Sequence, residues 1–234
     1  MTNNTPNTLP KIFCAVDTNH MDRAIDIAQS IQGVCGVKLG LEFFNAHGVK
    51  GVKQVMKTVK DTPLFLDLKY HDIPNTVAGA IRAVTQGIKP AFINVHATGG
   101  LDMMKAAKEA CPAETKLLAV TVLTSIDADT LDSVGQGNDP KSQVKRLALL
   151  AKQAGCDGVV CSSHEIEIIR ETCGDDFITM VPGIRPAGSD IGDQKRIMTP
   201  REAVDKGASH LVIGRPITQA DDPSQTATDI LGTL

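Results

Sequence analysis

The feature that most constrains the fold of this chain is a regular alternation of short apolar runs and longer amphipathic stretches. Eight apolar runs recur along the sequence, and each is followed by residues with the apolar spacing of a helix. The runs are continuously apolar, as is typical of parallel strands that are covered on both faces. They occupy residues 12–16, 36–39, 64–66, 92–95, 117–123, 158–161, 177–181 and 211–213.

Eight strand-then-helix units in 234 residues predict one closed (β/α)8 barrel, the TIM barrel, whose typical size is about 250 residues. An open doubly wound sheet is the alternative, but such a sheet usually carries a glycine-rich loop after its first strand. Here the first apolar run leads into Asp17-Thr18-Asn19-His20, which contains no glycine. The expected helices lie near residues 21–31, 49–59, 76–86, 101–110, 141–154, 165–172, 201–206 and 224–231.

The chain shows no internal linker, so we expect a single catalytic domain over residues 11–234, preceded by a flexible polar lead over residues 1–10. The 24 basic and 27 acidic residues leave a net charge of −3, which does not favour nucleic acid or anionic lipid as a partner. No apolar run approaches the ~18 residues that a membrane span needs, so we expect a cytoplasmic protein. The six cysteines lack metal-ligand spacing and are expected to be reduced, buried thiols.

Polar residues gather at or just past the ends of nearly all the predicted strands. In a barrel of this kind, the carboxyl ends of all strands open onto one face, where active sites are built. A single such residue would mean little, but the repetition predicts a site at this face. The residues are Asp17, Lys38, Asp67, Lys69, His96, Thr124, Ser125, Ser162, Ser163, Arg185, Gly214 and Arg215.

The densest polar cluster is Asp67-Leu68-Lys69-Tyr70-His71-Asp72. The period of two along an extended chain places Asp67 and Lys69 on the same side. The pair could simply be a structural ion pair that caps the barrel. Lys38 on the neighbouring strand adds a second cation, however, and alternating amines and carboxylates keep one another charged. Such a row can place a carboxylate against a like charge on a substrate, and an ammonium where a proton is needed.

A second cluster follows the last two predicted strands, in VPGIRP (181–186) and IGRP (213–216). The corresponding loops of TIM barrels often bind phosphate. Glycine lets main-chain N–H groups approach an anion, and arginine can donate two hydrogen bonds to it. Taken alone, Arg215 could equally be a surface arginine.

Five motifs in order, DLKYHDIPNT, VTVLTS, VPGIRP, GDQKRIMTP and VIGRP, resemble the bacterial type of the orotidine 5′-monophosphate decarboxylase family. The resemblance runs from residue 17 to about residue 223. DxKxxD is shared with related sugar-phosphate decarboxylases, whereas the HDIPNT extension with GIRP, GDQ and IGRP is more specific. The resemblance implies a carboxy-lyase that converts orotidine 5′-monophosphate to uridine 5′-monophosphate, the last step of UMP biosynthesis, with no metal and no organic cofactor.

The resemblance also implies roles for individual residues. Asp67 would lie against the substrate carboxylate, and Lys69 would protonate the ring carbon that loses carbon dioxide. Asp72 and Ile73 would reach into the site of a second subunit, with Thr76 nearby, which implies a homodimer. The other substrate contacts implied are Asp17 and Lys38 at the ribose, Thr124 and Ser125 at the pyrimidine edge, Pro182 beside the base, and Arg185, Gln194, Gly214 and Arg215 at the phosphate.

Two other functions stay open at this point. A magnesium-dependent sugar-phosphate decarboxylase, such as 3-keto-L-gulonate 6-phosphate decarboxylase, would share DxKxxD but needs the metal to stabilise an enediolate. A catalytically silent barrel could bind a phosphorylated metabolite without turnover. We expect His71 to support its loop, and His96 and Cys161 to pack, rather than to take part in chemistry.

Overall fold

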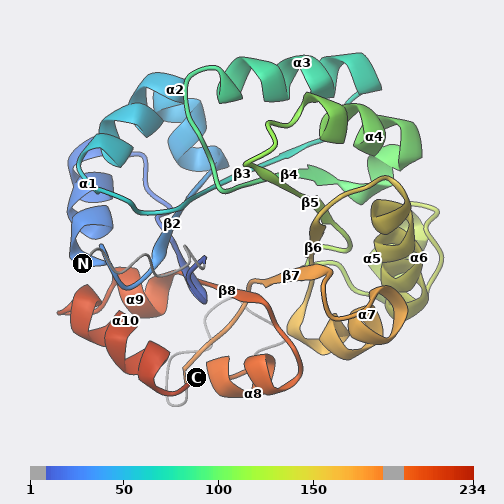
Figure 1. The fold of residues 1–234 in the computed structure, drawn as a ribbon. Coiled ribbons are helices and arrows are strands. Elements are labelled where there is room, and N and C mark those ends of the chain that lie inside the picture. Colours follow the sequence, from blue (N-terminus) through green and yellow to red (C-terminus); the bar gives the residue numbers. More distant parts are fainter. Residues whose placement is uncertain (1–8, 187–197) are drawn as a thin grey trace, which may run out of the picture.

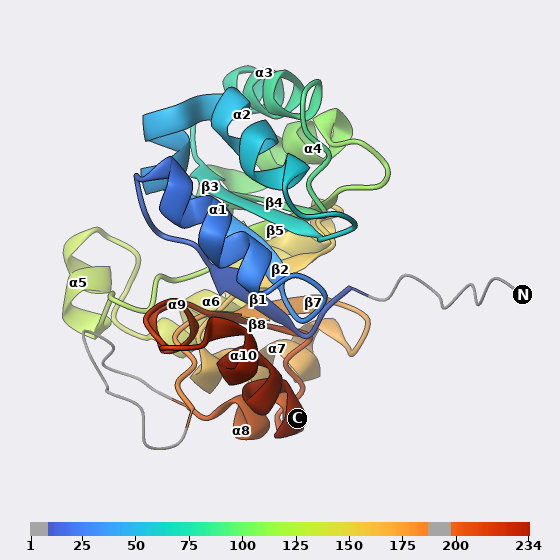
Figure 2. The same cartoon turned by 90° about the vertical axis from the view of Figure 1, so that its left-hand side faces the viewer.

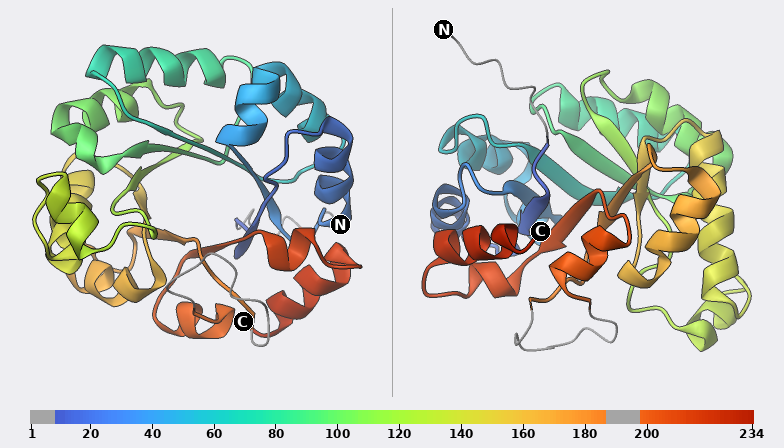
Figure 3. Two further views of the ribbon diagram at one scale, coloured as in Figure 1. Left: turned by 180° about the vertical axis from the view of Figure 1, so that it is seen from behind. Right: turned by 60° about the horizontal axis from the view of Figure 1, so that its bottom comes forward.

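The computed structural model of the protein describes residues 9–186 and 198–234. Within these residues, eight parallel strands close into a barrel in the order of the sequence. Figures 1 and 3 show the ring of strands with the helices outside it, from the front and from behind. The predicted single (β/α)8 barrel is confirmed. The strands are β1 (Ile12–Ala15), β2 (Gly36–Gly40), β3 (Leu64–Tyr70), β4 (Phe92–His96), β5 (Lys116–Val120), β6 (Gly158–Val160), β7 (Ile178–Val181) and β8 (His210–Ile213).

The helical layer differs from the sequence prediction after β5 and β8, where two helices follow instead of one. The segment after β5 has two helix starts, because Asp127 and Asp139 each accept a hydrogen bond from a main-chain N–H of the helix that follows. In Figure 2, α5 stands apart from the ring of helices. The helices are α1 (Met21–Ser30), α2 (Leu41–Lys57), α3 (Pro74–Thr85), α4 (Gly100–Ala110), α5 (Ala128–Ser133), α6 (Pro140–Gln153), α7 (Ile166–Cys173), α8 (Pro200–Asp205), α9 (Arg215–Thr218) and α10 (Pro223–Gly232), with short 3₁₀ turns at Ala97–Gly99 and Ser163–Glu165.

The interior of the barrel is filled by side chains near the amino ends of the strands. The rings of Phe13, Phe65 and Phe92 meet edge to face, with centroids 5.4–6.2 Å apart. His210 packs against this cluster and its Nδ1 lies 2.8 Å from the carbonyl oxygen of Pro10. A separate, larger core lies between the strands and the helices. The packed interior means that a ligand has room at the opposite end, where the strands finish.

Arg170 of α7 ties the starts of the last two strands together. Its guanidinium donates hydrogen bonds to the carbonyls of Phe177 and Gly207 and to the hydroxyls of Thr179 and Ser209. Charge-assisted hydrogen bonds of this kind are stronger than those between neutral groups. The sector of the barrel that leads to the predicted phosphate loops is therefore firmly anchored at its base.

Among the helices of the described residues, none is long and apolar enough to cross a membrane. All six cysteines are free thiols, five of them buried and Cys111 partly exposed. Burial raises the pKa of the Cys35 thiol to about 12. A buried thiol of this kind is a poor nucleophile, which agrees with the expected packing role.

Candidate active site

A cavity of about 740 Å³ opens where the barrel strands end. Its walls bring together residues from seven strands or the loops that follow them, so the sequence-predicted cluster is a single site in space. Nine of the predicted residues line it: Asp17, Lys38, Asp67, Lys69, Thr124, Pro182, Arg185, Gly214 and Arg215.

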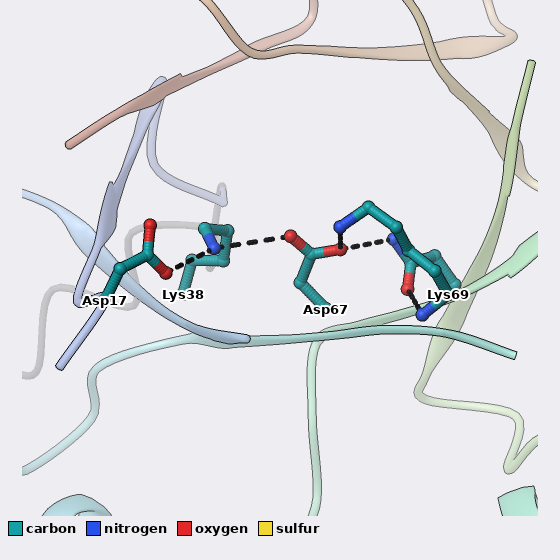
Figure 4. Close-up of polar contacts among 5 residues, drawn as sticks. Asp17, Lys38, Asp67 and Lys69 are labelled. Carbon is teal, nitrogen blue, oxygen red and sulfur yellow. Dashed lines mark hydrogen bonds and ion pairs between the residues drawn. The ribbon is translucent and has the colours of Figure 1, made fainter. Parts of the chain in front are cut away.

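Four of these side chains form a row of alternating charge, shown in Figure 4. The Lys38 Nζ atom lies 3.0 Å from Asp17 Oδ1 and 3.3 Å from Asp67 Oδ2. The Lys69 Nζ atom lies 2.5 Å from Asp67 Oδ1. Each interior member of the row therefore has an opposite charge on both sides, which offsets the cost of removing it from water.

The pKa values follow from this arrangement. Burial alone would raise the pKa of Asp67, but Lys38 and Lys69, together with hydrogen bonds from Lys69 and Asn94, hold it below the ordinary value. Burial alone would lower the pKa of Lys38, but Asp67 and Asp17 raise it above the ordinary value. At neutral pH, Asp67 is thus a carboxylate and Lys38 an ammonium, and neither exchanges protons readily.

Gly40 leaves space for the row at the end of β2. A Cβ atom at this position would lie 3.2 Å from Lys38 Nζ and 3.5 Å from Asp17 Oδ1. A side chain here would require Lys38 Nζ to shift by a few tenths of an ångström. The sequence prediction did not single out this glycine.

The side of the cavity predicted to bind phosphate is formed after β7 and β8. Gly183, at a φ of +77°, turns the chain after Pro182. Arg185 is buried, and its main-chain N–H donates to the carbonyl of Met198, 3.1 Å away. This contact joins the two ends of the segment 187–197, which lies outside the described residues and contains the predicted Gln194.

Four predicted residues do not line the cavity of their own chain: Asp72, Ile73, Thr76 and Ser125. Ile73 leaves 66% of its surface exposed, the largest exposed fraction among the large apolar side chains of the described residues. The neighbouring Asp72 is exposed and accepts a hydrogen bond from the N–H of Ile73 at 2.7 Å. The sequence prediction places Asp72, Ile73 and Thr76 in the site of a second chain, and Ser125 at the base in its own chain.

The sequence prediction missed Asn94 of β4. This residue has no exposed surface, and its side-chain amide contacts both Asp67 and Lys69. A signal was present, since Asn94 is the single polar residue in the apolar run 92–95. Nearby, the rings of His71 and His96 lie 5.7 Å apart, and burial, His71 and Lys69 lower the pKa of His96.

The rest of the cavity combines an apolar floor with a polar rim. Phe65, Val120, Val160 and Val212 form part of the floor, and their side chains point into the barrel. Cys161 also lines it; burial raises the pKa of its thiol, which agrees with packing. Among the described residues, no three histidine, cysteine or acidic side chains are grouped as metal ligands would be.

A model of the family described as orotidine 5′-phosphate decarboxylase / HUMPS matches residues 10–230 of this chain. The chain belongs to this family. The orotidine 5′-phosphate decarboxylase of Rhodospirillum rubrum is 51% identical over 232 residues, covering 95% of this chain and 93% of the relative. That of Sphingopyxis alaskensis is 50% identical over 224 residues, covering 95% and 98%.

Among solved structures, the orotidine 5′-phosphate decarboxylase of Lactobacillus acidophilus matches with a TM-score of 0.83 and 37% identity, covering 96% of this chain and 98% of that one. The family resemblance of the sequence motifs is therefore confirmed over nearly the whole chain. In this orotidine 5′-phosphate decarboxylase / HUMPS barrel, Asp67 and Lys69 of DxKxxD line one cavity together with residues of GIRP and IGRP.

Proposed function

We propose that this protein decarboxylates orotidine 5′-monophosphate to uridine 5′-monophosphate, the last step of UMP biosynthesis. The observation that carries the proposal is the charged row from Asp17 to Lys69 at the cavity. The row lies in a chain about half identical to curated orotidine 5′-phosphate decarboxylases. A magnesium-dependent sugar-phosphate decarboxylase is less well supported, because none of these relatives carries that name.

The chemistry explains why such a row is useful. When the bond between the ring and the carboxylate breaks, the electron pair stays on the ring carbon, in the plane of the ring and orthogonal to the π system. Delocalisation then helps little, and fixed charges must stabilise the carbanion. We propose that the Lys69 ammonium supplies this charge and then transfers a proton to the same carbon.

Asp67 has a different role in the proposal. Because its pKa is held below the ordinary value, Asp67 remains a carboxylate beside the substrate and is not the proton donor. Repulsion between the two carboxylates would be relieved as carbon dioxide leaves, while Lys38 keeps Asp67 charged in the empty site. Asp17 and Lys38 would also hold the ribose, and Thr124, Ser125 and Pro182 the base.

The phosphate lies far from the reacting carbon, but its binding energy can assemble the site. We assign it to the end of the cavity formed by Arg185, Gly214 and Arg215, with Gln194 from the adjoining segment. Arg185 and Arg215 line one cavity with Lys69, so both ends of a nucleotide could be held at once.

We also propose that the active unit is a homodimer in which Asp72, Ile73 and Thr76 complete the partner's site. The support is that these residues follow the catalytic strand directly yet do not line their own cavity. An exposed isoleucine beside an exposed aspartate would gain a buried environment at such an interface.

The function is tested by adding the purified protein to orotidine 5′-monophosphate in excess EDTA and following the ultraviolet absorbance. We expect rapid loss of the orotate band and formation of uridine 5′-monophosphate. Turnover that requires added magnesium would favour the metal-dependent decarboxylase. Nucleotide binding without turnover under either condition would favour a silent barrel.

Arg215→Ala should mainly weaken binding of the phosphate. Loss of a charged hydrogen bond costs about 1.5–3 kcal/mol, so KM should rise by about 10- to 150-fold. The matched control is Arg201→Ala, since Arg201 is an exposed arginine paired with Asp205 and away from the cavity. Steady-state kinetics of both variants check this, and an unchanged KM for Arg215→Ala would place the phosphate elsewhere.

A further inference from the structure

Strand β3, which carries Asp67 and Lys69, is irregular between these two residues. Leu66 of β3 pairs with Ile93 of β4, and the next pair is Tyr70 with Val95. Three residues of β3 (67–69) therefore face Asn94 alone, which is a β-bulge of more than the usual single extra residue. Such a bulge interrupts the main-chain ladder, so the polar groups within it need other partners.

The side-chain amide of Asn94 supplies one of those partners. Its Oδ1 accepts a hydrogen bond from the main-chain N–H of Lys69 at 2.8 Å. Its Nδ2 donates to Asp67 Oδ1 at 2.7 Å. One buried group thus contacts a main-chain atom of one charged residue and the carboxylate of the other.

Lys69 has a main-chain conformation that requires such support. Its φ is +48°, in the left-handed region that costs an ordinary residue about 1–2 kcal/mol. The hydrogen bond from its N–H to Asn94 holds the chain in this conformation. The same oxygen, Asp67 Oδ1, accepts from Lys69 Nζ and from Asn94 Nδ2, so the two donors fix the carboxylate from different directions.

We infer that Asn94 is a positioning residue: its carboxamide locks the Asp67 carboxylate and the Lys69 main chain into one geometry suited to proton transfer. The inference rests on the proposed decarboxylation. A carboxamide suits this position because it donates and accepts at once and stays neutral at every relevant pH. Aspartate would keep the acceptor but lose the donor, and alanine would lose both.

The charged groups around Asp67 determine how replacement of Asn94 changes the pKa values at the site. Lys38 from β2 and Lys69 from β3 contact Asp67 directly, Asp17 lies behind Lys38, and His96 of β4 is close enough to interact electrostatically. In Asn94→Asp, a second carboxyl group would lie beside Asp67. Two such groups cannot both ionise easily, so one pKa of the pair rises.

The test compares Asn94→Ala and Asn94→Asp with the wild type. For Asn94→Ala we expect kcat to fall by about 10²-fold, the effect of displacing a reacting group by about 1 Å, while affinity for uridine 5′-monophosphate changes little. For Asn94→Asp we expect the acidic limb of the kcat/KM profile to move to higher pH. The matched control is Thr179→Val, which removes a buried, hydrogen-bonded hydroxyl from a barrel strand outside the cavity and should leave that limb in place.

A kcat for Asn94→Ala within about threefold of the wild type would overturn the inference, as would an equal loss of kcat and nucleotide affinity. Should Asn94→Ala fail to fold, the isosteric Asn94→Asp decides, and an unshifted pH profile would overturn the inference. Wild-type protein that fails to turn over orotidine 5′-monophosphate would instead contradict the proposed function. In that case ¹³C titration of the two facing carboxyl groups in Asn94→Asp still decides: one of the two should titrate at higher pH than the Asp67 carboxyl does in the wild type, and two groups that titrate independently of each other would contradict the positioning role.

Discussion

Lys69→Ala should abolish turnover of orotidine 5′-monophosphate while the protein still folds and binds uridine 5′-monophosphate. The Lys69 ammonium is assigned both the stabilisation of the carbanion and the proton transfer, worth about 10²–10³-fold and 10²–10⁴-fold respectively. We therefore expect kcat to fall by at least about 10⁴-fold. Folding should survive because Asp67 keeps its ion pair with Lys38 and its hydrogen bond from Asn94.

Single-turnover kinetics measure the expected loss of turnover. Calorimetric titration with uridine 5′-monophosphate measures the binding that is expected to remain. The matched control is Lys116→Ala, because Lys116 also pairs with an aspartate, Asp157, but does not line the cavity. Lys69→Arg keeps a positive charge but gives up a proton far less readily, so it separates charge stabilisation from proton transfer. Near-normal turnover of Lys69→Ala would contradict the assigned role of this residue.

Much of the barrel could be predicted because its strands are buried on both faces and are therefore apolar throughout. The sequence prediction missed α5, a short helix within the loop after β5, because capping residues and turns give only short sequence signals. Period-two spacing predicted that Asp67 and Lys69 share one side of an extended segment, and the two side chains do meet, at 2.5 Å, although the strand is bulged between them. It gave no indication that Lys69 has a left-handed main chain.

The sequence marks Asn94 as a polar residue within an apolar run, but it could not reveal what Asn94 contacts, for a physical reason. The role of this residue depends on which atoms of β3 lie opposite it, and the bulge decides that register. Asn94 is 25 residues from Lys69 in the chain, so no local pattern records how the two strands align. Residues proposed to act across a subunit interface are harder still to predict, because a single chain does not show which atoms of a partner they would meet.

A mixing experiment tests that shared site. Asp72→Ala and Lys69→Ala should each be nearly inactive alone, and an equimolar mixture should recover activity after subunits exchange. In a mixed dimer, one site would combine Lys69 of one subunit with Asp72 of the other, and the second site would lack both. Half of the dimers would then hold one intact site of two, so we expect about a quarter of wild-type activity.

The control uses two residues that lie within one chain. Asp67 and Lys69 are in direct contact within one chain, so both belong to the same site. Asp67→Asn and Lys69→Ala therefore each damage the site of the subunit that carries them. Their mixture should stay inactive, because every site in a mixed dimer would lack one of the two. Recovery in the first mixture alone would therefore locate Asp72 in the partner's site. With subunit exchange verified by mass spectrometry, inactivity of both mixtures would mean that each site is complete within its own chain, and Ile73 would then need another explanation for its exposure.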